Sequence, residues 1–197
     1  MKTISIICQK GGVGKTTTVV NVAKIFSTLG YKTLIIDLDP QGNVSTYLNY
    51  DKNPEKDSNA IDLLEKKNDI VPGKISNNLD ILSSNIKISK FNEEKIVGGS
   101  KLQHSFNINK LDSYDLIIID TPPTMSSLVQ EALAVSDFYL IPAKPEFLAV
   151  EGVAQAMNFA KESIKSIQNT NPLFLGVLLN QIDKRRSSYL EFVTELE

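Results

Sequence analysis

The chain has 197 residues, a length that fits a single domain built around one buried core. Its 21 basic side chains nearly balance its 23 acidic ones, which argues against binding of nucleic acid by bulk charge and leaves only a local basic patch for DNA. Cys8 is the only cysteine, which excludes an intramolecular disulfide and a Cys-x-x-Cys zinc site and favours a reducing, cytoplasmic setting.

No segment predicts export or membrane insertion. The N-terminus lacks the long apolar stretch of a signal peptide. The longest apolar run, around Leu116 to Ile119, has the length of a strand and not of a membrane span. We therefore expect a soluble cytoplasmic protein with one domain over residues 1–197 and no membrane partner.

The first predicted elements are a strand, a glycine-rich loop and a helix. Thr3 to Cys8 is an apolar and β-branched run, typical of a buried strand, and it leads directly into the loop Gln9 to Thr18. The glycines of this loop let the backbone approach an anion, and Lys15 adds a full positive charge at the start of the helix. Helical spacing follows at Val19, Val22, Ala23, Phe26 and Leu29, with Gly30 at the C-terminal end.

The loop matches the phosphate-binding pattern G-x-x-x-x-G-K-[ST] only in part. Gly14-Lys15-Thr16 fit it, whereas Gln9 occupies the place of the first glycine and a second lysine, Lys10, follows it. Lysines beside glycines also occur in ordinary surface turns. Two lysines, three glycines and a threonine in this order, between a strand and a helix, favour nucleotide binding.

The middle of the chain predicts a second buried strand and a less regular region. Thr33 to Asp37 is a strand whose end delivers the polar segment Asp37 to Asn43, either a plain turn or a functional one. A short helix is predicted from Ala60 to Lys66 and a short strand from Leu79 to Leu82. From Asn85 to Asn109 we expect helix with a break at the glycine pair of residues 98 and 99.

The rest of the chain alternates strands and helices. The predicted strands are Leu116 to Ile119, Phe138 to Ile141, which Pro142 and Pro145 close, and Leu173 to Leu179. The predicted helices are Ser126 to Val135, Glu146 to Gln168 and a last one entered at Ser188.

This alternation predicts an α/β fold, a mostly parallel β-sheet flanked by helices on both faces. Ligands of such sheets bind at the carboxyl ends of the strands, and every polar motif lies at such an end. These motifs are the glycine loop, the segment from Asp37, Asp120 after the most apolar strand, and Asn180 after the last one. Lys15 and the backbone N–H groups of Gly12 to Thr16 can bind phosphate, while the Thr16 hydroxyl and Asp120 can hold magnesium.

Together these segments resemble the ParA/MinD family of deviant Walker A ATPases, a P-loop NTPase fold, and within it the ParA/Soj-type partition ATPases. The resemblance covers nearly the whole chain and is carried by Lys10 to Thr17, Asp37 to Asn43, Asp120 to Pro123 and Asn180. It implies ATP and Mg²⁺ as ligands. The implied ATP-binding residues are Lys10, Gly11, Gly12, Val13, Gly14, Lys15, Thr16, Thr17 and Asn180, and the implied metal site comprises Thr16, Asp39 and Asp120.

The resemblance also implies catalytic roles for Lys10, Lys15 and Asp39. Asp39 would position or activate the hydrolytic water, and Asn180 would read the adenine base. Lys10 would reach the phosphates of a second subunit across an ATP-dependent homodimer, much as an arginine finger does.

For the biological role, the resemblance implies partition of a plasmid or a chromosome origin. The ATP dimer would bind DNA without sequence preference and be nucleoid-associated, and a ParB-type partner would release it by stimulating hydrolysis. Lys184-Arg185-Arg186 is the one concentrated basic run and can contribute to such a DNA surface, although it is equally compatible with a solvated loop.

Two alternatives share the fold. A MinD-like membrane-associated positioning ATPase needs a basic, amphipathic terminal helix, whereas Ser187 to Glu197 is short and acidic. A small-molecule ATP-dependent ligase or synthetase, such as dethiobiotin synthetase, is the other, although no second substrate pocket is evident in the sequence. Because the chain ends at Glu197 inside the last predicted helix, we also expect it to lack the family's C-terminal elements.

Overall fold

The computed structural model describes residues 1–94, 100–109, 111–146, 149–167 and 171–183. They form a seven-stranded sheet in the order β3-β4-β2-β5-β1-β6-β7. All neighbouring strands are parallel except β3 and β4, which form an antiparallel hairpin at one edge. The strands are β1 (Lys2–Ile6), β2 (Thr33–Asp37), β3 (Gly73–Ser76), β4 (Leu79–Leu82), β5 (Leu116–Asp120), β6 (Phe138–Ala143) and β7 (Leu173–Leu179).

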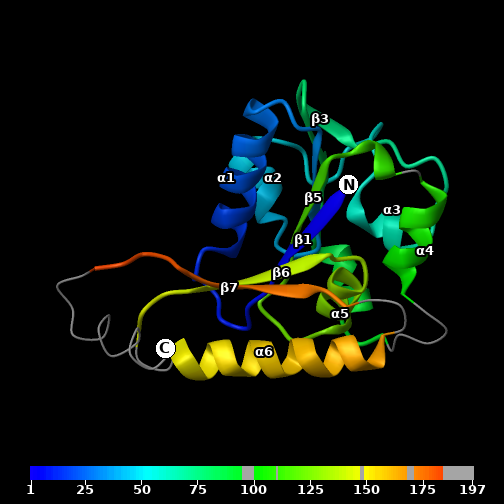
Figure 1. The fold of residues 1–197 in the computed structure, drawn as a ribbon. Coiled ribbons are helices and arrows are strands. Elements are labelled where there is room, and N and C mark those ends of the chain that lie inside the picture. The colour runs from blue at the N-terminus through cyan, green and yellow to red at the C-terminus, as the bar shows by residue number, and fades with distance from the viewer. Residues whose placement is uncertain (95–99, 110, 147–148, 168–170, 184–197) are drawn as a thin grey trace.

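Helices cover both faces of the sheet, as Figure 1 shows. On one face α1 and α2 pack against the inward side chains of β1, β2, β4 and β5. On the other face α3, α4, α5 and α6 build two further buried clusters. The helices are α1 (Lys15–Thr28), α2 (Asn43–Leu48), α3 (Ala60–Leu64), α4 (Lys101–Ile108), α5 (Ser127–Ala134) and α6 (Ala149–Ser166), with 3₁₀ turns η1 (Ile86–Phe91) and η2 (Leu111–Ser113). The predicted fold class is confirmed.

The central strands of the sheet are apolar because they are buried on both faces. All five residues of β2 and all five of β5 are buried, because helices lie above and below them. In register, Asp37 of β2 lies opposite Asp120 of β5, and Ile6 of β1 lies opposite Asp120 from the other side. The polar residues that follow these strands therefore lie side by side at the carboxyl ends of the strands.

The sequence-based boundaries match the observed ones for most strands, and three differences are informative. Pro142 does not close β6, which continues to Ala143; the pairing of β6 with β1 ends at Leu140, so the missing N–H of Pro142 removes no bond to β1. The antiparallel strand β3 and the short helix α2 were not predicted, because four- and six-residue elements carry too little periodicity.

The region from Asn85 to Asn109 contains η1 and α4, separated by a segment that includes residues outside the described ranges. The predicted break at residues 98 and 99 and the helix predicted from Ser188 fall outside the described residues. Among the residues that are described, no helix combines the length and the apolar character needed to cross a membrane. At the far edge, β7 pairs with β6 and keeps Leu173 and Leu175 exposed.

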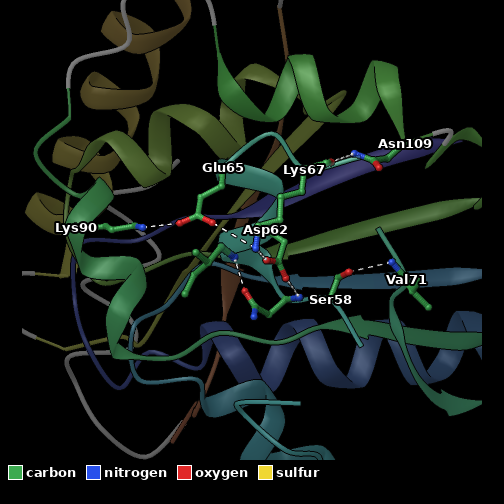
Figure 2. A network of polar contacts seen from close by, with 9 residues as sticks. Ser58, Asp62, Glu65, Lys67, Val71, Lys90 and Asn109 are labelled. Atoms are coloured by element: carbon green, nitrogen blue, oxygen red, sulfur yellow. Dashed lines mark hydrogen bonds and ion pairs between the residues drawn. The ribbon is translucent and has the colours of Figure 1, made fainter. Parts of the chain in front are cut away.

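Polar contacts fasten the α3 side of the sheet, as Figure 2 shows. Lys90 of η1 donates to Glu65 at 2.6 Å, and Lys67 donates to Asp62 in the first turn of α3 at 2.5 Å. Asn109, just after α4, donates to the carbonyl oxygen of Lys67 at 3.0 Å. Each such exposed contact is weak, but together they connect three elements that cover one buried cluster.

A buried carboxylate joins α4 to α5. Glu131 of α5 is 4% exposed and accepts hydrogen bonds from the Ser100 hydroxyl and from the backbone N–H groups of Lys101 and Leu102. These N–H groups belong to the first turn of α4, where no intrahelical carbonyl is available to them. The negative charge of Glu131 therefore caps α4 from a neighbouring helix.

We predict that Glu131→Gln lowers the free energy of unfolding by about 2 kcal/mol, because the amide turns an N–H₂ donor toward backbone donors. Urea denaturation followed by circular dichroism measures this. Glu162→Gln on the exposed side of α6 is the matched control and should change stability by less than about 0.5 kcal/mol. Equal stability of the two variants would contradict the capping role of Glu131.

Candidate active site

A hollow of about 330 Å³ opens at the carboxyl edge of the sheet. The glycine loop and the first turn of α1 form one wall, and the segment from Asp39 into α2 forms the other. Of the predicted site residues, those that line the hollow are Gly11, Gly12, Gly14, Lys15, Thr16, Thr17 and Asp39. The structure thus brings two segments predicted separately from the sequence around one space.

At two positions the backbone of the loop has a conformation that only glycine adopts without strain. Gly12 and Gly14 have φ values of 75° and 96°, in the left-handed region. At Gly14 space is also lacking, since an added Cβ would lie 2.0 Å from the Asn180 amide nitrogen. Helix α1 begins directly after Gly14, without a side-chain cap and without an acidic residue in its first turn. Its first N–H groups and its dipole are therefore available to an anion in the hollow.

Lys15 is the cation of the loop. It is 7% exposed, and its Nζ donates to the carbonyl oxygen of Lys10 at 3.2 Å, across the loop. Burial lowers the pKa of Lys15, while the nearby negative charges of Asp39 and Asp120 act in the opposite direction. A buried ammonium at the start of a helix is well suited to bind phosphate, which supplies the negative charge that burial makes necessary.

The turn after β2 is organised by Asp37. This carboxyl group is fully buried and accepts hydrogen bonds from the N–H groups of Asp39 at 2.9 Å and Val44 at 3.3 Å. Asp39 in turn accepts from the N–H of Gln41 at 2.9 Å and borders the hollow. Asp37 thereby fixes the backbone that presents Asp39, a role that the sequence did not reveal.

Asp120 connects β5 to the loop. Its Oδ2 accepts a hydrogen bond from the Thr16 hydroxyl at 2.6 Å, and its buried Oδ1 has no hydrogen-bond partner in the described part of the chain. Burial, together with the charge of Asp39, raises the pKa of Asp120 to about 7. Burial and the charge of Asp120 also raise the pKa of Asp37.

These oxygens fit a magnesium ion. In the described ranges no three His, Cys, Asp or Glu side chains converge as a complete metal cage. Mg²⁺ does not require one, because it commonly takes one or two protein oxygens and completes its shell with water and substrate phosphate. The hydroxyl of Thr16 and the unpartnered Oδ1 of Asp120 are ligands of the right chemistry.

The end of β7 is fastened to the glycine loop. Asn180 donates from Nδ2 to the carbonyl oxygen of Val13 at 3.0 Å, and Gln181 donates from Nε2 to that of Gly12 at 3.1 Å. The Asn180 side-chain oxygen accepts from the N–H of Gln181 at 2.9 Å. In this structure the Asn180 amide therefore holds the loop, and its predicted contact with adenine stays a prediction.

Lys10 lies outside the hollow. Its Nζ contacts Glu146 at 3.1 Å, and Lys144 contacts the other oxygen of the same carboxylate at 2.5 Å. These two cations lower the pKa of Glu146. The Lys10 side chain is 43% exposed, so this ion pair is weak and solvent competes with it.

Five lining residues were not among the predicted site residues: Gln41, Asn43, Tyr47, Pro123 and Gln181. The signal for Asn43 and Tyr47 was their spacing of four residues, which places both on one face of α2.

The predicted basic run Lys184-Arg185-Arg186 lies outside the described residues. Val13 is buried beneath the loop and does not line the hollow.

Comparison with known proteins gives consistent matches. A family model described as an AAA domain matches residues 1–173. The sporulation initiation inhibitor protein Soj of Bacillus subtilis is 34% identical over 202 residues, covering 100% of this chain and 79% of Soj. A putative plasmid partition protein from Borrelia burgdorferi, solved with bound AMPPNP, has a TM-score of 0.82 at 28% identity and covers 99% of this chain and 80% of that one. Cobyrinic acid a,c-diamide synthase from Mycobacterium smegmatis, solved with ADP and magnesium, has a TM-score of 0.85 at 27% identity, with the same coverage.

The raised pKa of Asp120 predicts a pH dependence of stability. An unfolded aspartate loses its proton near pH 4, whereas folded Asp120 keeps its proton up to about pH 7. Because the folded state binds more protons in this window, the free energy of unfolding falls as pH rises from about 4 to about 7. Without nucleotide, the melting temperature should be several degrees higher at pH 5.5 than at pH 8.

Asp120→Asn should reduce this difference and raise the melting temperature at pH 8, since the buried charge at position 120 is then absent. Thermal denaturation at the two pH values, with a chelator present, measures both effects. The exposed Asp112→Asn is the control and should behave like the parent. An undiminished pH difference in Asp120→Asn would show that Asp120 is not the titrating group.

Proposed function

The chain belongs to the ParA/Soj-type branch of the ParA/MinD family of P-loop ATPases, and we propose that it is an Mg²⁺-dependent ATPase of DNA partition. In this proposal the protein dimerises on ATP, binds DNA without sequence preference and leaves it when a ParB-type partner stimulates hydrolysis. It would act in the cytoplasm, on the nucleoid when ATP is bound. The observation that carries the proposal is the convergence of Lys15, Thr16 and Asp39 on one hollow, with Asp120 hydrogen-bonded to Thr16.

Each of these groups has a task in phosphoryl transfer. Lys15 and the N–H groups at the start of α1 bind the phosphates of ATP. Thr16 and Asp120 would hold Mg²⁺, which when bound neutralises charge on the phosphates. Asp39 borders the hollow and would orient the attacking water with its carboxylate. The buried carboxyl group of Asp37 accepts a hydrogen bond from the Asp39 N–H and so fixes the position of Asp39.

The position of Lys10 supports a role across a dimer. Within one chain its Nζ is paired with Glu146 and lies outside the hollow that Lys15 lines. Lys10 is exposed, and leaving a weak surface ion pair costs little. A second subunit facing this edge of the sheet would therefore meet a cation that can reach its phosphates, stabilise charge in the transition state and make hydrolysis depend on dimerisation.

Binding of DNA must come from local charge, because the net charge of the chain is -2. Lys184-Arg185-Arg186 follows the end of β7 in the sequence, next to the residues that fasten the glycine loop. Two such runs on one dimer would bind DNA by avidity, which would make DNA binding depend on ATP.

A second candidate function is favoured by the likeness to cobyrinic acid a,c-diamide synthase. In that case ATP would activate a carboxylate of a small molecule. Turnover stimulated by DNA together with a ParB-type partner supports the partition function, whereas turnover that requires a small carboxylic acid and an amide donor supports the second.

Lys15 and Asp39 should have separable effects. We predict that Lys15→Ala weakens ATP binding by about 30-fold or more, because the buried cation of the loop is lost. Asp39→Ala should bind ATP within about two-fold of the parent and lower kcat by about 100-fold or more. Titration calorimetry and phosphate release measure these. Normal hydrolysis by Asp39→Ala would remove the water-positioning role from this residue.

Lys10→Ala should bind ATP as a monomer and fail to dimerise. The measurement is light scattering after size-exclusion chromatography with ATP or ADP, in the hydrolysis-deficient Asp39→Ala background. Lys144→Ala is the matched control, since Lys144 shares the Glu146 carboxylate but is not part of the loop.

The same samples can test DNA binding by fluorescence anisotropy across salt concentrations. The parent should bind random-sequence duplex with ATP and not with ADP, with affinity falling steeply as salt rises. Dimerisation of Lys10→Ala at the level of the parent would overturn the role across subunits. Equal DNA binding with ATP and ADP, or none, would overturn the partition function.

A further inference from the structure

Tyr47 is an exposed aromatic side chain on the wall of the hollow. It is 57% exposed and extends from α2 toward the glycine-loop side, where its hydroxyl lies 3.3 Å from the Thr17 hydroxyl. Tyr47 follows Asn43 by four residues, so both lie on the face of α2 that borders the hollow. Exposure of a large ring at this place suggests a contact that a ligand completes.

The backbone fixes the place of Tyr47. Helix α2 starts at the turn that Asp37 holds, through the N–H of Val44, and Val44 is fully buried against α1. Before it, Gly42 has a φ of 59°, and an added Cβ there would lie 2.4 Å from the carbonyl oxygen of Ser84. The start of α2 is therefore fixed by these contacts, and from it the Tyr47 side chain reaches Thr17.

The hydroxyl of Tyr47 has donor capacity to spare. Its one hydrogen bond within the described part of the chain is the contact with Thr17, and 3.3 Å is long for a bond between two hydroxyl groups, which is usually about 2.7 to 2.8 Å. A phenol can donate one hydrogen bond and accept others. Donation to a negatively charged oxygen would be shorter and stronger.

Thr17 indicates which part of a nucleotide is near. It lies in the first turn of α1, beyond Lys15 and Thr16. In a glycine loop of this kind the lysine reaches the β- and γ-phosphates, while the backbone cradles the α- and β-phosphates. Thr17 belongs to the backbone at the start of α1, which would cradle the α- and β-phosphates. The Thr17 side of the hollow would therefore face the part of the phosphate chain that ATP and ADP share.

We propose that the Tyr47 hydroxyl is a direct ligand of the bound nucleotide, donating a hydrogen bond to an α- or β-phosphate oxygen on the Thr17 side of the hollow. This inference rests on the proposed function, since it takes a nucleotide to be the ligand. The nucleotide would then have a contact with α2 as well as its contacts with the glycine loop. The β2–α2 segment, which carries Asp39, is thereby joined to the nucleotide independently of the γ-phosphate.

The test is Tyr47→Phe, which removes one oxygen atom and keeps the ring. The dissociation constants of the full chain for ADP and for AMPPNP, both with Mg²⁺, are measured by titration calorimetry. Loss of a hydrogen bond to a charged group should raise both constants by about ten-fold. Tyr31→Phe is the matched control, because Tyr31 is similarly exposed and its ring packs against Phe26, away from the lining of the hollow.

The outcomes separate the two proposals. Equal losses for ADP and AMPPNP in Tyr47→Phe, with unchanged melting temperature of the free protein, support the contact. Parental affinity of Tyr47→Phe, or a loss for AMPPNP alone, overturns it and leaves the proposed function standing; a loss for AMPPNP alone would place Tyr47 at the γ-phosphate or at a subunit contact. Failure of the parent to bind either nucleotide overturns both proposals.

Discussion

Asp37 and Asp120 end two adjacent central strands in register, and both carboxyl groups are fully buried. Asp39 and the ammonium group of Lys15 lie beside them, so positive and negative charge are concentrated at buried positions. Without a ligand such a cluster lowers the stability of the fold, and the raised pKa of Asp120 reflects this. A magnesium ion and a phosphate chain supply the opposite charges, which makes ligand binding a source of stability for the whole edge of the sheet.

The glycine loop depends on contacts from three directions. Thr16 bonds to β5 through Asp120, and the carbonyl oxygens of Gly12 and Val13 accept hydrogen bonds from the two residues that follow β7. The ammonium of Lys15 closes the loop on itself. These contacts fix the backbone of the loop, so a phosphate group would meet donors that need little rearrangement.

The two lysines of the loop have different surroundings, and this gives them different chemistry. Lys15 is buried and lines the hollow, whereas Lys10 is exposed and pairs with Glu146 outside it. An exposed cation suits contact with a second subunit, while a buried one suits a fixed phosphate. The likeness to a cobyrinic acid a,c-diamide synthase solved with ADP and magnesium shows that this fold also occurs in a protein named for a different function.

The sequence by itself determined the parallel strands, the main helices and the phosphate loop, because these depend on local periodicity and on glycines at fixed positions. It also placed Asp39 and Asp120 at one edge, since parallel strands share their carboxyl ends. Only the tertiary structure decided that Asn180 occupies the space beside Gly14, that Lys10 pairs with Glu146, and that Tyr47 approaches Thr17. Two of these three contacts join residues more than 130 positions apart, and the third depends on a helix too short to show a period, so strand register and helix packing fixed them.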